Sequence, residues 1–190
     1  SEIARQIIWH YNIVWSTSLK YLGVHFKSGL SLEVEHNIAI QKFYTAANAV
    51  CSHVRFGFEM SKLFLVESFC LPILSYCCES LNYSKKQVHH LNVCWNNVYR
   101  KIFGMNRWES VRELQFLCER LDFVHIHVLR KLTFLSKISR SSNAILKICF
   151  NVFNRSAELS LLTHEFNVTI DTCTIGTLRH NVFDNFARTI

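Results

Sequence analysis

The sequence predicts a mainly α-helical protein that opens with a short β-hairpin. Its 190 residues include only 5 Gly and 1 Pro but 15 Phe, and 49% of them are hydrophobic. Such a composition favours a folded chain with a sizeable core over disorder or a turn-rich β fold. Apolar residues recur at helical spacing after about residue 30, whereas β-branched and aromatic residues dominate the stretch before it.

The hairpin is predicted from two stretches, residues 7–15 and 19–26, with Ser16-Thr17-Ser18 as the turn between them. Gly23 lies inside the second stretch. A glycine in a strand either marks a β-bulge or permits the close approach of another backbone or a ligand. Both interpretations of Gly23 stay open at this point.

The first helix is expected to begin after Ser31, a good N-cap residue, and to run to about residue 54. Glu33 and Glu35 would then lie in its first turn, where negative charge is favourable. The second helix is expected over about residues 61–81, with a bend near Pro72.

The apolar run at residues 63–78 raises the question of a membrane span. It is shorter than the roughly 20 apolar residues that a bilayer demands, and it includes Glu67 and Pro72. We therefore interpret it as part of a buried helix and expect no membrane partner.

The clearest helical signal lies between Ser84 and Gly104. Ser84 and Gln87 are spaced as a capping box, and Gly104 stands where a helix often ends in a left-handed residue. The inward face is expected to hold Val88, Leu91, Trp95, Val98 and Ile102. At about 100° per residue, the opposite face presents Lys86, His90, Asn97 and Arg100. Asn97 and Arg100 are expected to lie one turn apart, free for a partner.

Ser110 to Glu113 also fits a capping box, for a helix to about residue 121 with Leu117 on its inward face. Asp122 is expected to cap a fifth helix. The outer face of that helix carries Arg130, Thr133 and Lys137 at i, i+3 and i+7. Weaker helical patterns follow at residues 142–153 and 156–165, and Gly176 precedes a candidate last helix to Arg188.

Positive charge is concentrated in one segment. Residues 85–147 carry 12 Lys and Arg against 4 acidic residues, so the net charge of +7 lies within them. A clustered basic excess is what a surface needs to bind a polyanion, because each neutralised phosphate releases condensed counterions. An ordinary solvated helix face can give the same composition, and both interpretations stay open.

The 8 Cys and 10 His give no clear metal or nucleophile pattern. No Cys-x-x-Cys pair occurs, and the adjacent His89 and His90 would point about 100° apart on a helix. Most cysteines lie among apolar residues, where a free thiol acts as a small hydrophobe. The first residues lack an export signal, so we expect reduced thiols and an intracellular location, in nucleus or cytoplasm. No cofactor is expected in this chain.

Two tryptophans are candidates for stacking on nucleobases. Trp95 falls on the inward face of its helix and is interpreted as a core residue. Trp108 follows Arg107 in a predicted loop and is the better of the two candidates for contact with a base.

An ordered series of landmarks resembles the reverse transcriptases of LINE-type (non-LTR) retrotransposons, in the part that follows their catalytic palm motifs. The landmarks are Lys20-Tyr21-Leu22-Gly23-Val24, Phe43-Tyr44-Thr45-Ala46-Ala47-Asn48, Phe69-Cys70-Leu71-Pro72-Ile73-Leu74, Leu91-Asn92-Val93-Cys94-Trp95-Asn96, Tyr99-Arg100-Lys101-Ile102-Phe103 and Arg107-Trp108-Glu109-Ser110-Val111. The resemblance covers about residues 7–140 and fades beyond about residue 150.

The resemblance implies a palm-edge hairpin at residues 1–29, a helical thumb-like domain at 30–140 and a C-terminal helical extension at 141–190. Polymerases of this family hold two Mg²⁺ ions on paired aspartates, whereas no two acidic residues are adjacent in this chain. The catalytic carboxylates are therefore expected upstream, in the palm and fingers of the same polyprotein. The chain alone is expected to be inactive.

The expected function is to hold the RNA template and the DNA primer or product strand through their phosphates. The candidate contacts are Gly23, near the primer, and Lys86, Asn97, Arg100, Lys101, Arg130 and Lys137 on the helices. Two alternatives stay open, namely a helical protein-interaction module and a decayed retroelement relic without activity.

Overall fold

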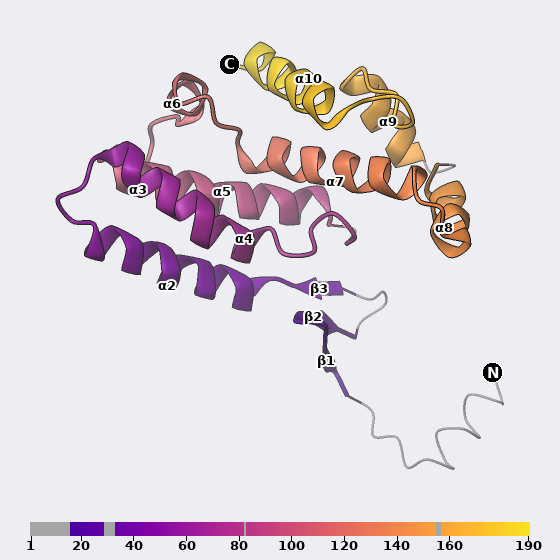
Figure 1. Cartoon of the computed structure of the whole chain (residues 1–190). Coiled ribbons are helices and arrows are strands. Elements are labelled where there is room, and N and C mark those ends of the chain that lie inside the picture. Colours follow the sequence, from indigo (N-terminus) through magenta and orange to yellow (C-terminus); the bar gives the residue numbers. More distant parts are fainter. Residues whose placement is uncertain (1–15, 29–32, 82, 155–156) are drawn as a thin grey trace. The chain divides into compact units, whose positions relative to one another are not determined.

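The computed structural model describes residues 16–28, 33–81, 83–154 and 157–190 (Figure 1). The predicted strand at residues 7–15 and the predicted cap Ser31 lie outside them. The described chain is mainly helical, with one small three-stranded antiparallel sheet near its start, so the predicted fold class is confirmed. The chain divides into two compact units, residues 1–38 and residues 39–190. The boundaries predicted after residues 29 and 140 stay predictions.

The first unit contains a tight β-hairpin. Strands β1 (Ser18–Tyr21) and β2 (Val24–Lys27) pair so that Tyr21 faces Val24, which leaves Leu22 and Gly23 as a two-residue turn. Both turn residues have positive φ, 45° and 83°. This matches a type I′ turn, whose twist suits a hairpin and whose second position favours glycine. The prediction of one continuous strand over residues 19–26 is therefore wrong, and Gly23 is a turn residue rather than a strand residue.

A third strand occupies the place where the first helix was expected to begin. Strand β3 (Glu33–Glu35) pairs with β2, and Lys27 Nζ lies 2.6 Å from Glu35 Oε2 across the two strands. The hydrogen bond from Lys27 lowers the pKa of Glu35. Because β2 satisfies the backbone groups of this segment, helix α2 (Asn37–His53) begins only afterwards. The prediction of Glu33 and Glu35 in a helical first turn is wrong.

The second predicted helix is broken into three pieces. These are α3 (Glu59–Leu65), the π-helical turn η1 (Val66–Cys70) and α4 (Leu71–Leu74). The irregular turn ends two residues before Pro72, which lacks an N–H and disturbs the hydrogen-bond ladder. The helix ends at Leu74 rather than near residue 81, and Cys77 then takes a left-handed φ of 56°.

Helix α5 (Lys85–Phe103) matches its prediction closely. Ser84 Oγ accepts from Gln87 N at 3.3 Å, and Gln87 Oε1 accepts from Ser84 N at 2.8 Å, which completes the capping box. Gly104 ends the helix with a φ of 65°. Trp95 is fully buried and packs edge-on against Tyr99, so its interpretation as a core residue is confirmed.

The capping box predicted at Ser110 does not form. The N-cap of helix α6 (Arg112–Leu117) is Val111, and no side chain caps the helix through a hydrogen bond. Val111 is buried in the core, and so Ser110 does not occupy the N-cap position. Leu117, predicted to be inward, is 78% exposed. The helix ends there because Glu119 takes a left-handed φ of 55°.

Helix α7 (Phe123–Ser139) begins as predicted, with Asp122 Oδ1 accepting from His125 N at 2.9 Å. The chain continues through α8 (Ala144–Asn154), α9 (Ala157–Glu165) and α10 (Ile175–Arg188), close to the three weaker helical patterns. No helix of the described residues is long and apolar enough to cross a membrane.

Two hydrophobic clusters meet along α7. The first surrounds Trp95 and joins α2, α3, η1 and α5 to Phe123 at the start of α7. The second joins the rest of α7 to the C-terminal helices, with Leu178 and Val182 of α10 fully buried. Figure 1 shows α7 between α5 and α10. Burial raises the pKa of Cys78, one of the buried thiols, to about 12.

Candidate nucleic-acid interface

The basic stripe predicted on α7 lines a cavity of about 380 Å³, which we call the basic pocket. Arg130, Thr133 and Lys137 contribute to it from α7, and Arg179 contributes from α10. Glu79, from the turn after α4, is the one carboxylate among the described residues of its wall. The structure therefore brings Arg130 and Lys137 together, as the helical spacing predicted.

No hydrogen bond or ion pair joins the three cations of the basic pocket to any residue that the structure describes. Arg130 is half-buried, whereas Lys137 and Arg179 are exposed. Glu79 accepts a hydrogen bond from Cys78 Sγ at 3.6 Å. Three positive charges beside one negative charge leave the pocket cationic and suited to an anion.

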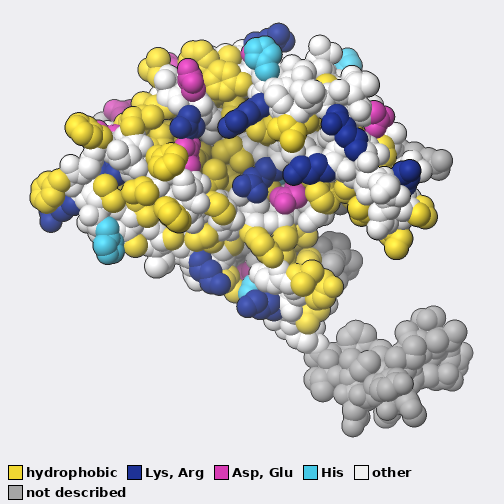
Figure 2. Space-filling view, in the orientation of Figure 1, with side chains coloured by type: hydrophobic (Ala, Val, Ile, Leu, Met, Phe, Trp, Pro, Cys, Tyr) yellow, Lys and Arg dark blue, Asp and Glu magenta, His cyan; other side chains and the backbone are white. Residues whose placement is uncertain are grey.

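Figure 2 shows where basic side chains gather on one face of the molecule. Lys and Arg side chains gather over α7 and toward α10, and fewer acidic side chains lie among them on this face. This concentration of positive charge arises from the fold, because it combines residues from two separate segments of the sequence. Arg179 lies outside the basic segment of residues 85–147, and no sequence pattern indicated that it would lie beside Arg130.

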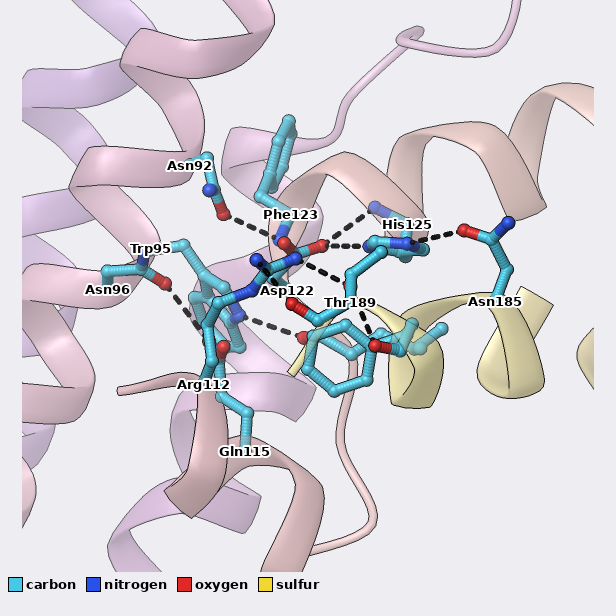
Figure 3. Close-up of polar contacts among 12 residues, drawn as sticks. Asn92, Trp95, Asn96, Arg112, Gln115, Asp122, Phe123, His125, Asn185 and Thr189 are labelled. Carbon is cyan, nitrogen blue, oxygen red and sulfur yellow. Dashed lines mark hydrogen bonds and ion pairs between the residues drawn. The ribbon is translucent and has the colours of Figure 1, made fainter. Parts of the chain in front are cut away.

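The position of Arg179 depends on how α10 is held against the rest of the second unit. His125 of α7 contacts two residues (Figure 3). Its Nδ1 lies 2.6 Å from Asp122 Oδ1, and its Nε2 lies 3.3 Å from Asn185 Oδ1 on α10. At the C-terminal end of α10, Arg112 donates to the Thr189 carbonyl oxygen at 3.0 Å and to its hydroxyl at 2.7 Å. These contacts, with the buried face of α10, fix the second side of the basic pocket.

Asn97 and Arg100 of α5 lie one turn apart as predicted, but they are not free. Arg100 Nη1 donates to Asn97 Oδ1 at 3.1 Å, and Arg100 Nε donates to the carbonyl oxygen of Glu109 at 3.0 Å. Asn97 Nδ2 donates to the Tyr44 hydroxyl of α2 at 3.2 Å. The chain itself supplies these partners, because α2 and the loop after α5 pack beside this face.

Lys101 is engaged in the same way, since its Nζ donates to Asn48 Oδ1 on α2. Lys86 is exposed near the start of α5 and lines neither pocket described here. Gly23 belongs to the unit of residues 1–38. The predicted contact residues thus form three sets. Arg130 and Lys137 on α7 line the basic pocket, whereas the α5 residues Asn97, Arg100 and Lys101 are hydrogen-bonded to other residues of the chain. Gly23 and Lys86 belong to neither set.

Trp108 lies in the loop after α5, as predicted, and is 88% exposed. The Arg107 guanidinium lies 5.5 Å from the centroid of its ring. A cation on the ring face is a favourable arrangement that helps to orient the indole. Trp108 therefore remains a candidate for stacking on a base.

A second cavity, of about 410 Å³, adjoins the basic pocket and shares Leu129 and Arg179 with it. We call it the apolar pocket, because Phe64, Leu71, Ile126 and Phe183 line much of it. Its polar wall holds an ion pair, in which Arg120 Nε donates to Glu67 Oε2 at 2.8 Å. Burial raises the pKa of Glu67, and the hydrogen bond from Arg120 opposes that rise.

Within the described residues, no three His, Cys, Asp or Glu side chains lie close enough together to hold a metal ion. No protein-family model, curated protein or solved structure matches the chain. The function must therefore be inferred from the geometry of the side chains and from the resemblance of the sequence landmarks.

Proposed function

We propose that this chain binds the sugar–phosphate backbone of nucleic acid through the basic pocket. The observation that supports it most is the convergence of Arg130, Lys137 and Arg179 from two helices on one cavity, where none of them has a hydrogen bond or ion pair with a described residue. A guanidinium presents a planar fork that fits two phosphate oxygens, and an ammonium adds a compact positive charge. Such contacts set the position of a strand without reading its sequence.

An RNA–DNA duplex is the ligand that fits this surface best. Its A-like form displays phosphates and 2′-hydroxyls more readily than base edges. Thr133 lies between Arg130 and Lys137 along the α7 stripe, and its hydroxyl can donate to or accept from a 2′-hydroxyl. Together with the resemblance of the sequence landmarks, this side-chain set is the basis for proposing the role of a thumb-like part of a LINE-type reverse transcriptase.

In that role, Gly23, Lys86, Asn97, Arg100 and Lys101 would be additional contacts to template or primer. Arg100 and Lys101 would have to share their donors between phosphate and their present partners. The Mg²⁺ ions of the reaction would be held by carboxylates elsewhere in the parent polymerase.

A protein-interaction role is the second candidate, and exposed apolar side chains favour it. Ile145, Ile148 and Val152 are spaced as one stripe of α8 and are each at least 64% exposed. Phe56 and Phe58, in the loop before α3, are more exposed still. Contiguous exposed apolar area of this kind is typical of surfaces that contact other proteins.

The test compares two triple variants of the full chain in binding a short RNA–DNA duplex. In the first, Arg130, Lys137 and Arg179 are all replaced by Gln. In the matched control, Lys42, Lys147 and Arg188 are replaced by Gln, which removes the same charge from exposed sites outside the basic pocket. Exposed ion pairs contribute about 0.2–1 kcal/mol each, so the first variant should bind roughly 3- to 150-fold more weakly.

The control variant should lose at most a few-fold in affinity, in line with its smaller effect on the local field. Equal losses of affinity in the two variants would mean that duplex binding depends on net charge alone and not on the basic pocket. No loss in either would remove the basis of the nucleic-acid role and favour the protein-interaction module.

A further inference from the structure

We propose that the apolar pocket receives one unpaired nucleobase while the phosphate of the same nucleotide lies in the basic pocket. This inference rests on the proposed function. The two cavities share Leu129 and Arg179, so one ligand can extend from one cavity into the other. A nucleotide has the matching division into a flat, largely apolar base and an anionic phosphate. The volume of about 410 Å³ lies within the usual range for small-molecule sites, about 300–1,000 Å³.

The apolar walls suit a base. Phe64 of α3 lines the pocket and is 62% exposed, so much of its ring is open to a ligand. Phe183 of α10 also lines it, and its ring is held by stacking on Phe116, with centroids 5.8 Å apart and an interplanar angle of 18°. Aromatic side chains stack on any nucleobase, because every base has a π-face.

The polar wall offers an acceptor beside a donor. Glu67 uses Oε2 for Arg120, and its other carboxylate oxygen has no hydrogen bond with any described residue. Arg120 donates through Nε and Nη1, which leaves Nη2 without a partner among the same residues. The edge of a nucleobase presents both donors and acceptors, so it can meet this pair.

The charge on the two sides of the shared wall also fits one nucleotide. Arg179 stands where the cavities join, and Arg130 and Lys137 lie on the side away from the apolar pocket. A phosphate beside Arg179 would therefore meet the basic pocket, while the base attached to it would face Leu129 and Ile126. Paired bases inside a duplex are stacked and cannot enter, so the pocket should select an unpaired nucleotide.

The test measures the affinity of the full chain for three RNA–DNA duplexes of equal length. One is blunt, one carries a single unpaired nucleotide at an end, and the third carries an abasic residue at that position. The unpaired nucleotide should increase affinity roughly tenfold over the blunt duplex. The abasic residue keeps the phosphate but lacks the base, so its duplex should bind like the blunt one.

Phe64→Ala removes one stacking face from the pocket, and Phe58→Ala removes a similarly exposed ring that lines neither cavity. Phe64→Ala should reduce the preference for the unpaired base and leave blunt-duplex affinity unchanged, whereas Phe58→Ala should change neither. Equal affinity of the wild-type chain for the unpaired-base and abasic duplexes would overturn this inference alone. Absence of binding to all three duplexes would overturn the proposed function together with it.

Discussion

Trp95 and Trp108 have different roles, because the first is buried and the second is exposed. Trp95 is fully buried, and its Nε1 donates to the Leu121 carbonyl oxygen at 3.4 Å. Its ring contacts both Tyr99 and Phe43. Trp108 is exposed and contacts Arg107. The first residue therefore acts through the stability of the fold, while the second is available to a ligand.

Replacement of Trp95 by Ala should lower the free energy of unfolding by about 3–5 kcal/mol, because the large cavity left in the core cannot fully collapse. Trp108→Ala is the matched control and should stay within about 0.5 kcal/mol of the wild type. Denaturant unfolding of the three proteins measures both effects. An unchanged midpoint for Trp95→Ala would contradict its place in the core.

Helical spacing predicted the outward position of Arg100 and Arg130 equally well, yet their surroundings differ. Arg100 is bonded to Asn97 and to the Glu109 carbonyl oxygen, whereas Arg130 lines an open pocket. Periodicity shows which side of a helix a residue occupies and says nothing of what packs beside that side. The availability of a basic residue is a tertiary property, and so the sequence could not distinguish the two.

At the scale of the element, local signals succeeded where no tertiary contact competed with them. Ser84 caps α5 as predicted, but the similar signal at Ser110 failed because Val111 is drawn into the core and becomes the N-cap of α6. Glu33 and Glu35 were assigned to a helix, and pairing with β2 made the segment a strand instead. Sequence patterns thus predicted the presence of most helices better than their first residues.

Two glycines at helix ends should respond in opposite directions to replacement by Ala. Gly104 ends α5 with a φ of 65°, a conformation that costs an L-residue about 1–2 kcal/mol, so Gly104→Ala should destabilise by that amount. Gly176 lies in the first turn of α10, and an added Cβ would meet only Thr174 Oγ1 at 3.7 Å. Gly176→Ala should therefore stabilise by about 0.4–1 kcal/mol. Chemical denaturation of both variants measures the sign of each change in the free energy of unfolding. Equal changes in the two variants would contradict this account of the two helix ends.

At the scale of the second unit, the basic pocket depends on elements far apart in the sequence. Arg130 and Arg179 share one pocket because α10 packs on α7 through Leu178, Val182 and the contact of His125 with Asn185. Arg112 of α6 holds the end of α10 through Thr189. The stripe on α7 was predictable from spacing. Its partner on α10 was not, because nothing local to Arg179 indicates which helix it will face.

The salt dependence of binding tests the central claim most directly. The affinity of the full chain for an RNA–DNA duplex is measured over a series of salt concentrations and plotted on logarithmic axes. Each phosphate contact contributes about −0.7 to −0.9 to the slope. Replacement of Arg130, Lys137 and Arg179 by Gln should therefore make the slope shallower by about 2–3 units, with little change in thermal stability. A salt-independent affinity, or an identical slope in the triple variant, would contradict the claim that these three residues bind phosphate.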